Sequence, residues 1–123
     1  NGADVFIFGI TKAPKSINGL LSHFSLNKED VDYLILHQAN MLMNDKIRKK
    51  VGIDEPKVPY SIDEYGNTSS ASIPLTMVAR LQEEVVGSKQ RFLACGFGVG
   101  LSWGSVFFET NNIVCPAIIK YNT

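Results

Sequence analysis

Apolar residues recur with a helical period in the first part of this chain and then form a short continuous run. Residues 4–24 carry apolar side chains at helical spacing, including Ile17 and Leu21, and predict mostly helix. Pro14 lies within this stretch, and we expect it to kink the helix or to divide it in two. The continuous apolar run at residues 33–36 is typical of a strand that is buried on both faces.

Helical and strand-like patterns then alternate. Residues 40–51 predict a second helix, and residues 58–62 predict a further strand. A third helix is predicted to begin at a cap on Ser69 or Ser70 and to end at Gly87. Strands that alternate with helices favour an α/β layered fold.

Two more strands are predicted after the third helix, at residues 91–95 and 101–109, and the glycine-rich link between them suits a hairpin. The tail, residues 111–123, contains two short apolar runs and is a candidate edge strand. A chain of 123 residues is long enough to bury one core.

Charge and composition narrow the classes of function. The formal net charge is zero, which argues against nucleic-acid binding, and no apolar stretch is long enough to predict a membrane span. The two cysteines do not form a metal-type cluster, so we expect reduced thiols, no metal site and a cytoplasmic protein. The first residue is Asn, and a hydrophobic run follows closely, which suggests a segment of a longer protein.

Two polar clusters stand at predicted strand–helix junctions, where open α/β sheets place their chemistry. His37 follows the strand at residues 33–36, and Asn67 precedes the third helix. An imidazole and an amide can both donate hydrogen bonds to a developing oxyanion. Each residue also has a simpler interpretation, His37 as a structural histidine and Asn67 as part of a turn and helix cap.

A third junction is the glycine run from Gly96 to Gly100. It lies between two strands and does not open a helix, so it does not fit a dinucleotide-binding loop. Its backbone N–H groups could serve an oxyanion, or the run could be only a tight connection. We weighed Cys95 as a nucleophile and expect instead a buried thiol, because it lies in an apolar strand.

The second helix carries a basic surface, with Lys46, Lys49 and Lys50 on one face. Such a surface is usually only solvated, but it could also dock an acidic partner.

Together, three segments resemble the C-terminal half of β-ketoacyl-acyl-carrier-protein synthase III, within the thiolase-like superfamily. They are LILHQAN at 34–40, YGNTSSASIP at 65–74 and GFGVGLSWGS at 96–105, in the family's order and spacing. The resemblance implies one half of an αβαβα architecture with a mixed five-stranded sheet. It assigns residues 1–110 to the half-domain and leaves 111–123 as a C-terminal extension.

By this resemblance, His37 and Asn67 are two members of a Cys-His-Asn triad whose Cys lies in an N-terminal half outside this sequence. The backbone N–H of Gly100 would contribute to an oxyanion hole. The residues implied to bind substrate or carrier protein are Phe6, Gln38, Asn40, Lys46, Lys49 and Lys50. The implied reaction is decarboxylative condensation of an acyl-CoA primer with malonyl-acyl-carrier protein, at the start of fatty acid synthesis and without a cofactor.

The sequence departs from the family at several positions. Leu42 stands where the family often has an arginine that contacts the carrier protein, and Val99 occupies the middle of a usual glycine triplet. Such enzymes are usually homodimers. A specialised condensing enzyme of secondary metabolism, or a non-catalytic domain that binds acyl-CoA or carrier protein, therefore stays open as an alternative.

Overall fold

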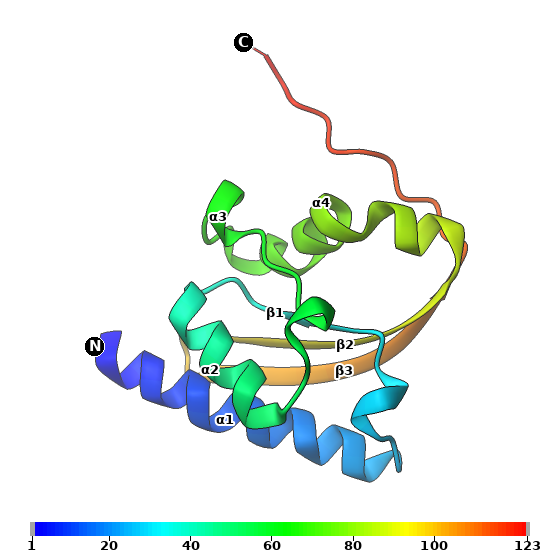
Figure 1. The fold of residues 1–123 in the computed structure, drawn as a ribbon. Coiled ribbons are helices and arrows are strands. Elements are labelled where there is room, and N and C mark those ends of the chain that lie inside the picture. Colours follow the sequence, from blue (N-terminus) through cyan, green and yellow to red (C-terminus); the bar gives the residue numbers. More distant parts are fainter. Residues whose placement is uncertain (1, 123) are drawn as a thin grey trace.

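The computed structural model describes residues 2–122, which fold into three layers with a central sheet between helices (Figure 1). Residue 1 of the predicted half-domain (1–110) and residue 123 of the predicted C-terminal extension (111–123) lie outside the described residues. The longer elements are α1 (Gly2–His23), β1 (Tyr33–Leu36), α2 (Met41–Val51), α4 (Ser72–Gly87), β2 (Lys89–Gly98) and β3 (Ser102–Asn111). Short helical turns complete the chain: η1 (Lys28–Asp30), η2 (Glu55–Lys57), α3 (Ile62–Tyr65) and η3 (Ser69–Ala71).

The sheet is mixed. The strand order is β1-β2-β3, with β1 parallel to β2 and β2 antiparallel to β3. The register pairs Leu36 with Cys95, so the carboxyl end of β1 lies beside the distal half of β2. This confirms the predicted α/β class. However, the described residues form three strands, where the resemblance predicted five.

Hydrophobic residues on the two sides of the sheet explain the layers. Leu34 and Leu36 of β1 pack in a large core beneath α1 and α2, whereas Ile35 between them packs beneath α4. All three side chains are fully buried. The continuous apolar run of β1 is therefore buried on both faces, as its pattern predicts.

The predicted break at Pro14 is wrong, because α1 is one helix of 22 residues with Pro14 buried inside it. Proline lacks an N–H, so it leaves the carbonyl four residues earlier without its helical donor. That carbonyl belongs to Ile10, and it accepts a hydrogen bond from the ammonium of Lys50 in α2, at 3.0 Å. A side chain from the neighbouring helix thus replaces the lost main-chain donor.

Two further predictions of strands are wrong. Residues 58–61 form a loop and Ile62 begins α3, because Pro59 cannot donate to a ladder and Ser61 turns its N–H to a buried side chain. Asn111 is the last residue of β3, and residues 112–122 pair with no strand. Instead, Ile113 donates its N–H to the carbonyl of Val85, and Gln82 donates to the carbonyl of Cys115, which fixes the start of the tail against α4.

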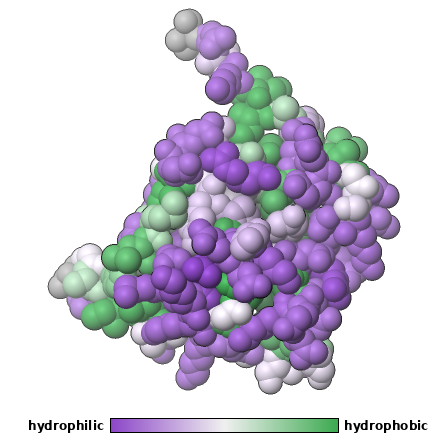
Figure 2. Space-filling view, in the orientation of Figure 1, coloured by the Kyte–Doolittle hydropathy of each residue, from purple (hydrophilic) through white to green (hydrophobic). Residues whose placement is uncertain are grey.

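The surface drawn in Figure 2 is mostly polar, with apolar atoms near the start of α1 and along the tail. Within residues 2–122, no helix combines the length and apolar character that a membrane crossing needs.

Candidate active site

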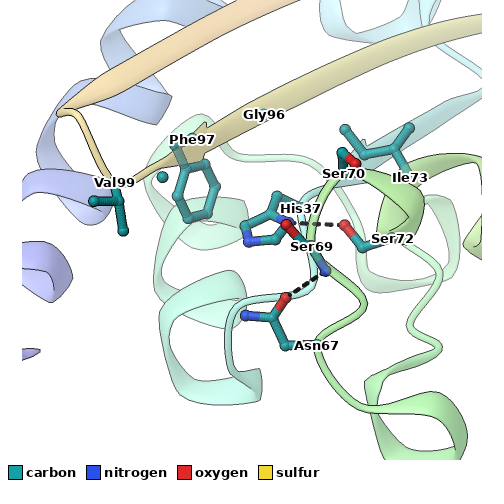
Figure 3. A pocket seen from close by; sticks show the side chains of 10 residues that line it. His37, Asn67, Ser69, Ser70, Ser72, Ile73, Gly96, Phe97 and Val99 are labelled. Atoms are coloured by element: carbon teal, nitrogen blue, oxygen red, sulfur yellow. Dashed lines mark hydrogen bonds between the residues drawn. The ribbon is translucent and has the colours of Figure 1, made fainter.

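A cavity of about 790 Å³ opens where β1 and β2 end and α4 begins. In Figure 3 the ring of His37 lies between Phe97 of β2 and Ser72 of α4, with Asn67 below it. The lining residues are His37, Asn67, Ser69, Ser70, Ser72, Ile73, Gly96, Phe97, Gly98 and Val99. The three junctions singled out from the sequence therefore meet in one place. The positive end of the dipole of α4 also faces this region, which favours negative charge there.

His37 is held on both sides of its peptide unit. Its N–H donates to the carbonyl of Cys95 at 3.0 Å, which continues the β1–β2 ladder, and its carbonyl accepts from the amide of Asn44 at 3.0 Å. The ring lies edge-to-face with Phe97, with centroids 5.4 Å apart and an angle of 83° between the planes. The backbone and the ring are thus fixed by separate contacts.

The surroundings of the imidazole favour its neutral form near pH 7. Its Nδ1 lies 2.7 Å from the hydroxyl of Ser72, the first residue of α4 (Figure 3). Burial lowers the pKa of His37 below its usual 6.5, while hydrogen bonding to the main chain of Ser69 acts in the opposite direction and has the smaller effect. Nδ1 is thus engaged by Ser72, and no side chain among residues 2–122 forms a hydrogen bond with Nε2.

Asn67 is exposed and follows Gly66. The φ of Gly66 is +70°, a value that residues with a side chain rarely adopt. Its Oδ1 accepts a hydrogen bond from the N–H of Ser69 at 2.9 Å. That bond fixes which end of the amide is oxygen, and Nδ2 has no acceptor among residues 2–122. The amide can therefore donate to a ligand in the cavity.

The glycine run forms the opposite wall. Gly96 and Gly98 line the cavity, and a Cβ on Gly96 would lie 3.8 Å from Ile73. Gly100 lies beyond this wall, in the exposed turn between β2 and β3, with φ of +142°. The residues that line the cavity end at Val99, so the predicted oxyanion role of Gly100 stays a prediction.

None of the six residues predicted to bind substrate or carrier protein lines this cavity. Gln38 is fully buried, its Nε2 donates to the carbonyl of Leu36, and its Oε1 accepts from the N–H groups of Ser61 and Ile62. Because a substrate cannot reach it in this arrangement, the structure places Gln38 in a supporting position and not at a contact surface.

Asn40 and Phe6 also have structural surroundings. Asn40 caps α2, and its Oδ1 accepts from the N–H of Met43 at 2.7 Å. Phe6 is half-buried and packs against the core beneath α1. Their predicted contacts with substrate or carrier protein stay predictions.

The three lysines of α2 differ in their partners. Lys49 pairs with Asp45 at 2.7 Å, and Lys50 bonds to the carbonyl of Ile10. Lys46 is exposed and has no ion-pair partner among residues 2–122. Lys46 is thus the most available of the three for an acidic partner.

Cys95 is a buried thiol, as predicted. Burial raises its pKa, and a weaker contact with Ser105 opposes that shift. Its side chain belongs to the core beneath α1, while the imidazole of His37 bonds to Ser72 of α4. The thiol and the imidazole thus have different hydrogen-bond partners, and no hydrogen bond joins them among residues 2–122.

Ser72 is the residue of the site that the sequence did not identify. The signal was present only as a run of small residues at the start of the third helix. Nothing in that run distinguishes Ser72 from Ser70, because the contact with His37 joins residues 35 positions apart.

The family profile described as 3-oxoacyl-[acyl-carrier-protein] synthase III C terminal matches residues 21–110. The β-ketoacyl-[acyl-carrier-protein] synthase III of Streptococcus agalactiae is 43% identical over 111 residues, which is 89% of this chain and 34% of that protein. The corresponding enzyme of Oceanobacillus iheyensis is 38% identical over 106 residues, 86% of this chain and 34% of that protein.

Solved structures give the same result. The 3-oxoacyl-(acyl-carrier protein) synthase of Burkholderia xenovorans superposes with a TM-score of 0.92 at 34% identity, over 96% of this chain and 34% of that one. The synthase III of Pseudomonas aeruginosa superposes with a TM-score of 0.85 at 31% identity, over 93% and 36%. The chain thus spans about a third of the length of these relatives. It has the thiolase-like fold of a half-domain and belongs to the family of 3-oxoacyl-[acyl-carrier-protein] synthase III C-terminal domains.

Proposed function

We propose that this chain supplies the decarboxylation half of a β-ketoacyl-acyl-carrier-protein synthase III. The complete protein would condense an acyl-CoA primer with malonyl-acyl-carrier protein at the start of fatty acid synthesis. The observation that supports this most is that His37 and Asn67 reach one cavity, each with a neutral nitrogen not used by its described side-chain bond.

The chemistry needs two such donors. In the malonyl thioester, the bond between the carboxylate and the methylene carbon breaks, CO₂ leaves, and the electron pair passes into an enolate. Nε2–H of His37 and Nδ2–H of Asn67 would both donate to the enolate oxygen. A neutral imidazole suits this role because it stabilises the oxygen without protonating the carbanion, and burial favours that neutral form.

The enolate carbon would then attack the acyl group carried on a cysteine thioester. A carbon–carbon bond forms, the bond to sulfur breaks, and the thiolate leaves. We assign this cysteine to a part of the enzyme outside the present sequence, since Cys95 is buried beneath α1 and Cys115 packs beside α4. The same assignment implies that the site is completed by an N-terminal half.

The exposed surface of α2 would receive the acidic carrier protein. Lys46 and Lys49 are both exposed there. Gly100 would have a separate role and donate its N–H to the oxyanion during acyl transfer from coenzyme A. Homodimer formation, a cytoplasmic location and the boundary between the half-domain and a C-terminal extension at residue 110 belong to the same proposal.

A second candidate is a priming condensing enzyme of secondary metabolism. The priming β-ketosynthase of the R1128 polyketide pathway superposes with a TM-score of 0.82 at 27% identity, over 89% of this chain. The substitutions at Leu42 and Val99 fit such a specialised carrier or primer. Comparing turnover with carrier proteins from the two kinds of pathway would distinguish the candidates.

The experiment that tests the proposal separates the two half-reactions in the full-length protein. His37→Ala and Asn67→Ala should each slow malonyl decarboxylation about 10²- to 10³-fold, because each removes one donor worth roughly 2.7–4 kcal/mol. Transfer of the primer to the cysteine should stay detectable in both. Unimpaired condensation in either variant would refute the assignment.

A further inference from the structure

Four buried residues are linked by hydrogen bonds of their side chains and main chains, and the series ends on His37. Gln38, Ser61, Ser72 and Thr76 are each no more than 1% exposed. The N–H of Ser61 donates to Oε1 of Gln38 at 3.0 Å, and the hydroxyls of Ser61 and Thr76 are 2.7 Å apart. Ser72 then connects to Nδ1 of His37 at 2.7 Å. Buried polar groups hold such fixed arrangements because each unmade bond is costly.

The direction of each bond follows from the number of protons available. The hydroxyl of Thr76 donates its only proton to the carbonyl of Ser72 at 2.7 Å, so the hydroxyl of Ser61 must donate to Thr76. The N–H of Gln38 donates to Oγ of Ser72 at 3.3 Å. Oγ of Ser72 therefore already serves as an acceptor, and its own proton needs an acceptor in turn.

Among residues 2–122, Nδ1 of His37 is the one acceptor in hydrogen-bond contact with that proton. If Nδ1 carried a proton instead, the buried hydroxyl of Ser72 would be left without an acceptor. We propose that Ser72 is a positioning residue whose hydroxyl donates to Nδ1 and so fixes the tautomer that carries its proton on Nε2. Its role in catalysis rests on the proposed function of His37, whereas the tautomer itself does not.

One contact competes with this arrangement. The main chain of Ser69 forms a hydrogen bond that favours the protonated imidazole. If Nδ1 carried hydrogen and donated it to that main chain, the tautomer of His37 would not depend on the hydroxyl of Ser72. The two arrangements differ in which ring nitrogen carries hydrogen, and this difference can be measured.

The test is long-range ¹H–¹⁵N correlation spectroscopy on the full-length protein labelled in its histidines, with His37→Ala identifying the signals of His37. In the wild type we expect one tautomer, with hydrogen on Nε2 and none on Nδ1. Ser72→Ala should give a mixture of tautomers and slow decarboxylation by roughly tenfold to a hundredfold. Ser72→Thr keeps the hydroxyl and should restore the single tautomer.

Ser88→Ala is the matched control, because it removes a serine hydroxyl from the far end of α4 and should leave the tautomer unchanged. If Ser72→Ala does not fold, Ser72→Cys keeps the side-chain volume with a weaker donor and should also mix the tautomers. Hydrogen on Nδ1 in the wild type, or an unchanged single tautomer in the folded Ser72 variants, would overturn the inference. Failure of the proposed function would give a different result. The Ser72 variants would change the tautomer of His37 as expected, but His37→Ala would still catalyse condensation at the normal rate.

Discussion

At the scale of the residue, the site depends on the surroundings of one imidazole. His37 is partly withdrawn from water, has the edge of Phe97 against it and bonds to Ser72 through Nδ1. Burial disfavours the charged ring, so His37 stays neutral where an exposed histidine would begin to protonate. A neutral ring is the form that can donate from Nε2 without acting as a strong acid.

This environment predicts the acid limb of the pH profile. Because the pKa of His37 is lowered, the neutral donor persists as the pH falls through 6.5 and is lost only at a lower pH. The rate of malonyl decarboxylation at saturating substrate, measured from pH 8 to pH 5 in the full-length protein, should therefore have its half-maximal point below about 6.5. A midpoint at or above that value would mean that burial does not lower the pKa of the His37 ring.

That His37 and Asn67 lie at one cavity could be predicted from the sequence, but the residues that support them could not. His37 and Asn67 stand at junctions between elements, and the topology of α/β sheets brings such junctions to one edge. Gln38 belongs to the same motif and was predicted to contact ligand, yet it is fully buried. The sequence does not show which residue of a motif faces inward, because burial depends on packing against α3 and α4.

At the scale of the element, a hydrogen bond joins α1 to α2 at the place where Pro14 leaves an acceptor without its donor, in addition to the core that the two helices share. Pro14 leaves the carbonyl of Ile10 without a helical donor, and Lys50 fills that role. The sequence pattern predicted a kink or a break at Pro14, because nothing near Pro14 in the sequence indicates that a donor 40 positions from Ile10 will bond to its carbonyl. The predicted strand at residues 58–62 fails for a related reason, since the N–H of Ser61 bonds to Gln38 in preference to a ladder.

A double-mutant cycle tests this interpretation of Pro14. Lys50→Met keeps most of the side-chain length and loses the donor, so it should lower the free energy of unfolding by about 0.5–1.5 kcal/mol. In the Pro14→Ala background the alanine N–H supplies the carbonyl, and the cost of Lys50→Met should nearly vanish. Urea unfolding of the four proteins measures both costs, with Lys46→Met as the control for loss of charge alone. Equal costs in the two backgrounds would contradict the account.

At the scale of the molecule, the sheet presents an apolar edge. Val99, Leu101, Trp103 and Val106 lie in or beside β3 and are each about half exposed or more. This strand pairs on one side only among the described residues. Exposed apolar side chains on an unpaired edge favour association with another chain. In a protein of the relatives' length, we expect the other two thirds to cover this region.

The apolar edge gives a prediction for residues 1–123 expressed alone. The protein should self-associate in sedimentation velocity at micromolar concentration, because its exposed edge lacks a cover. Val106→Lys should reduce this association, since a charge on an edge strand opposes pairing. A monodisperse, stable monomer of the unaltered chain would show that the edge needs no partner.

The proposed chemistry requires that His37 and Asn67 act together on a single oxygen. The direct measurement is the rate of CO₂ release from a malonyl thioester by the full-length protein, compared among wild type, His37→Ala, Asn67→Ala and the double variant. We predict losses of about 10²- to 10³-fold for each single variant, and a loss in the double variant well below the product of the two. Release of CO₂ at the wild-type rate in either single variant, or fully multiplicative losses, would contradict the claim.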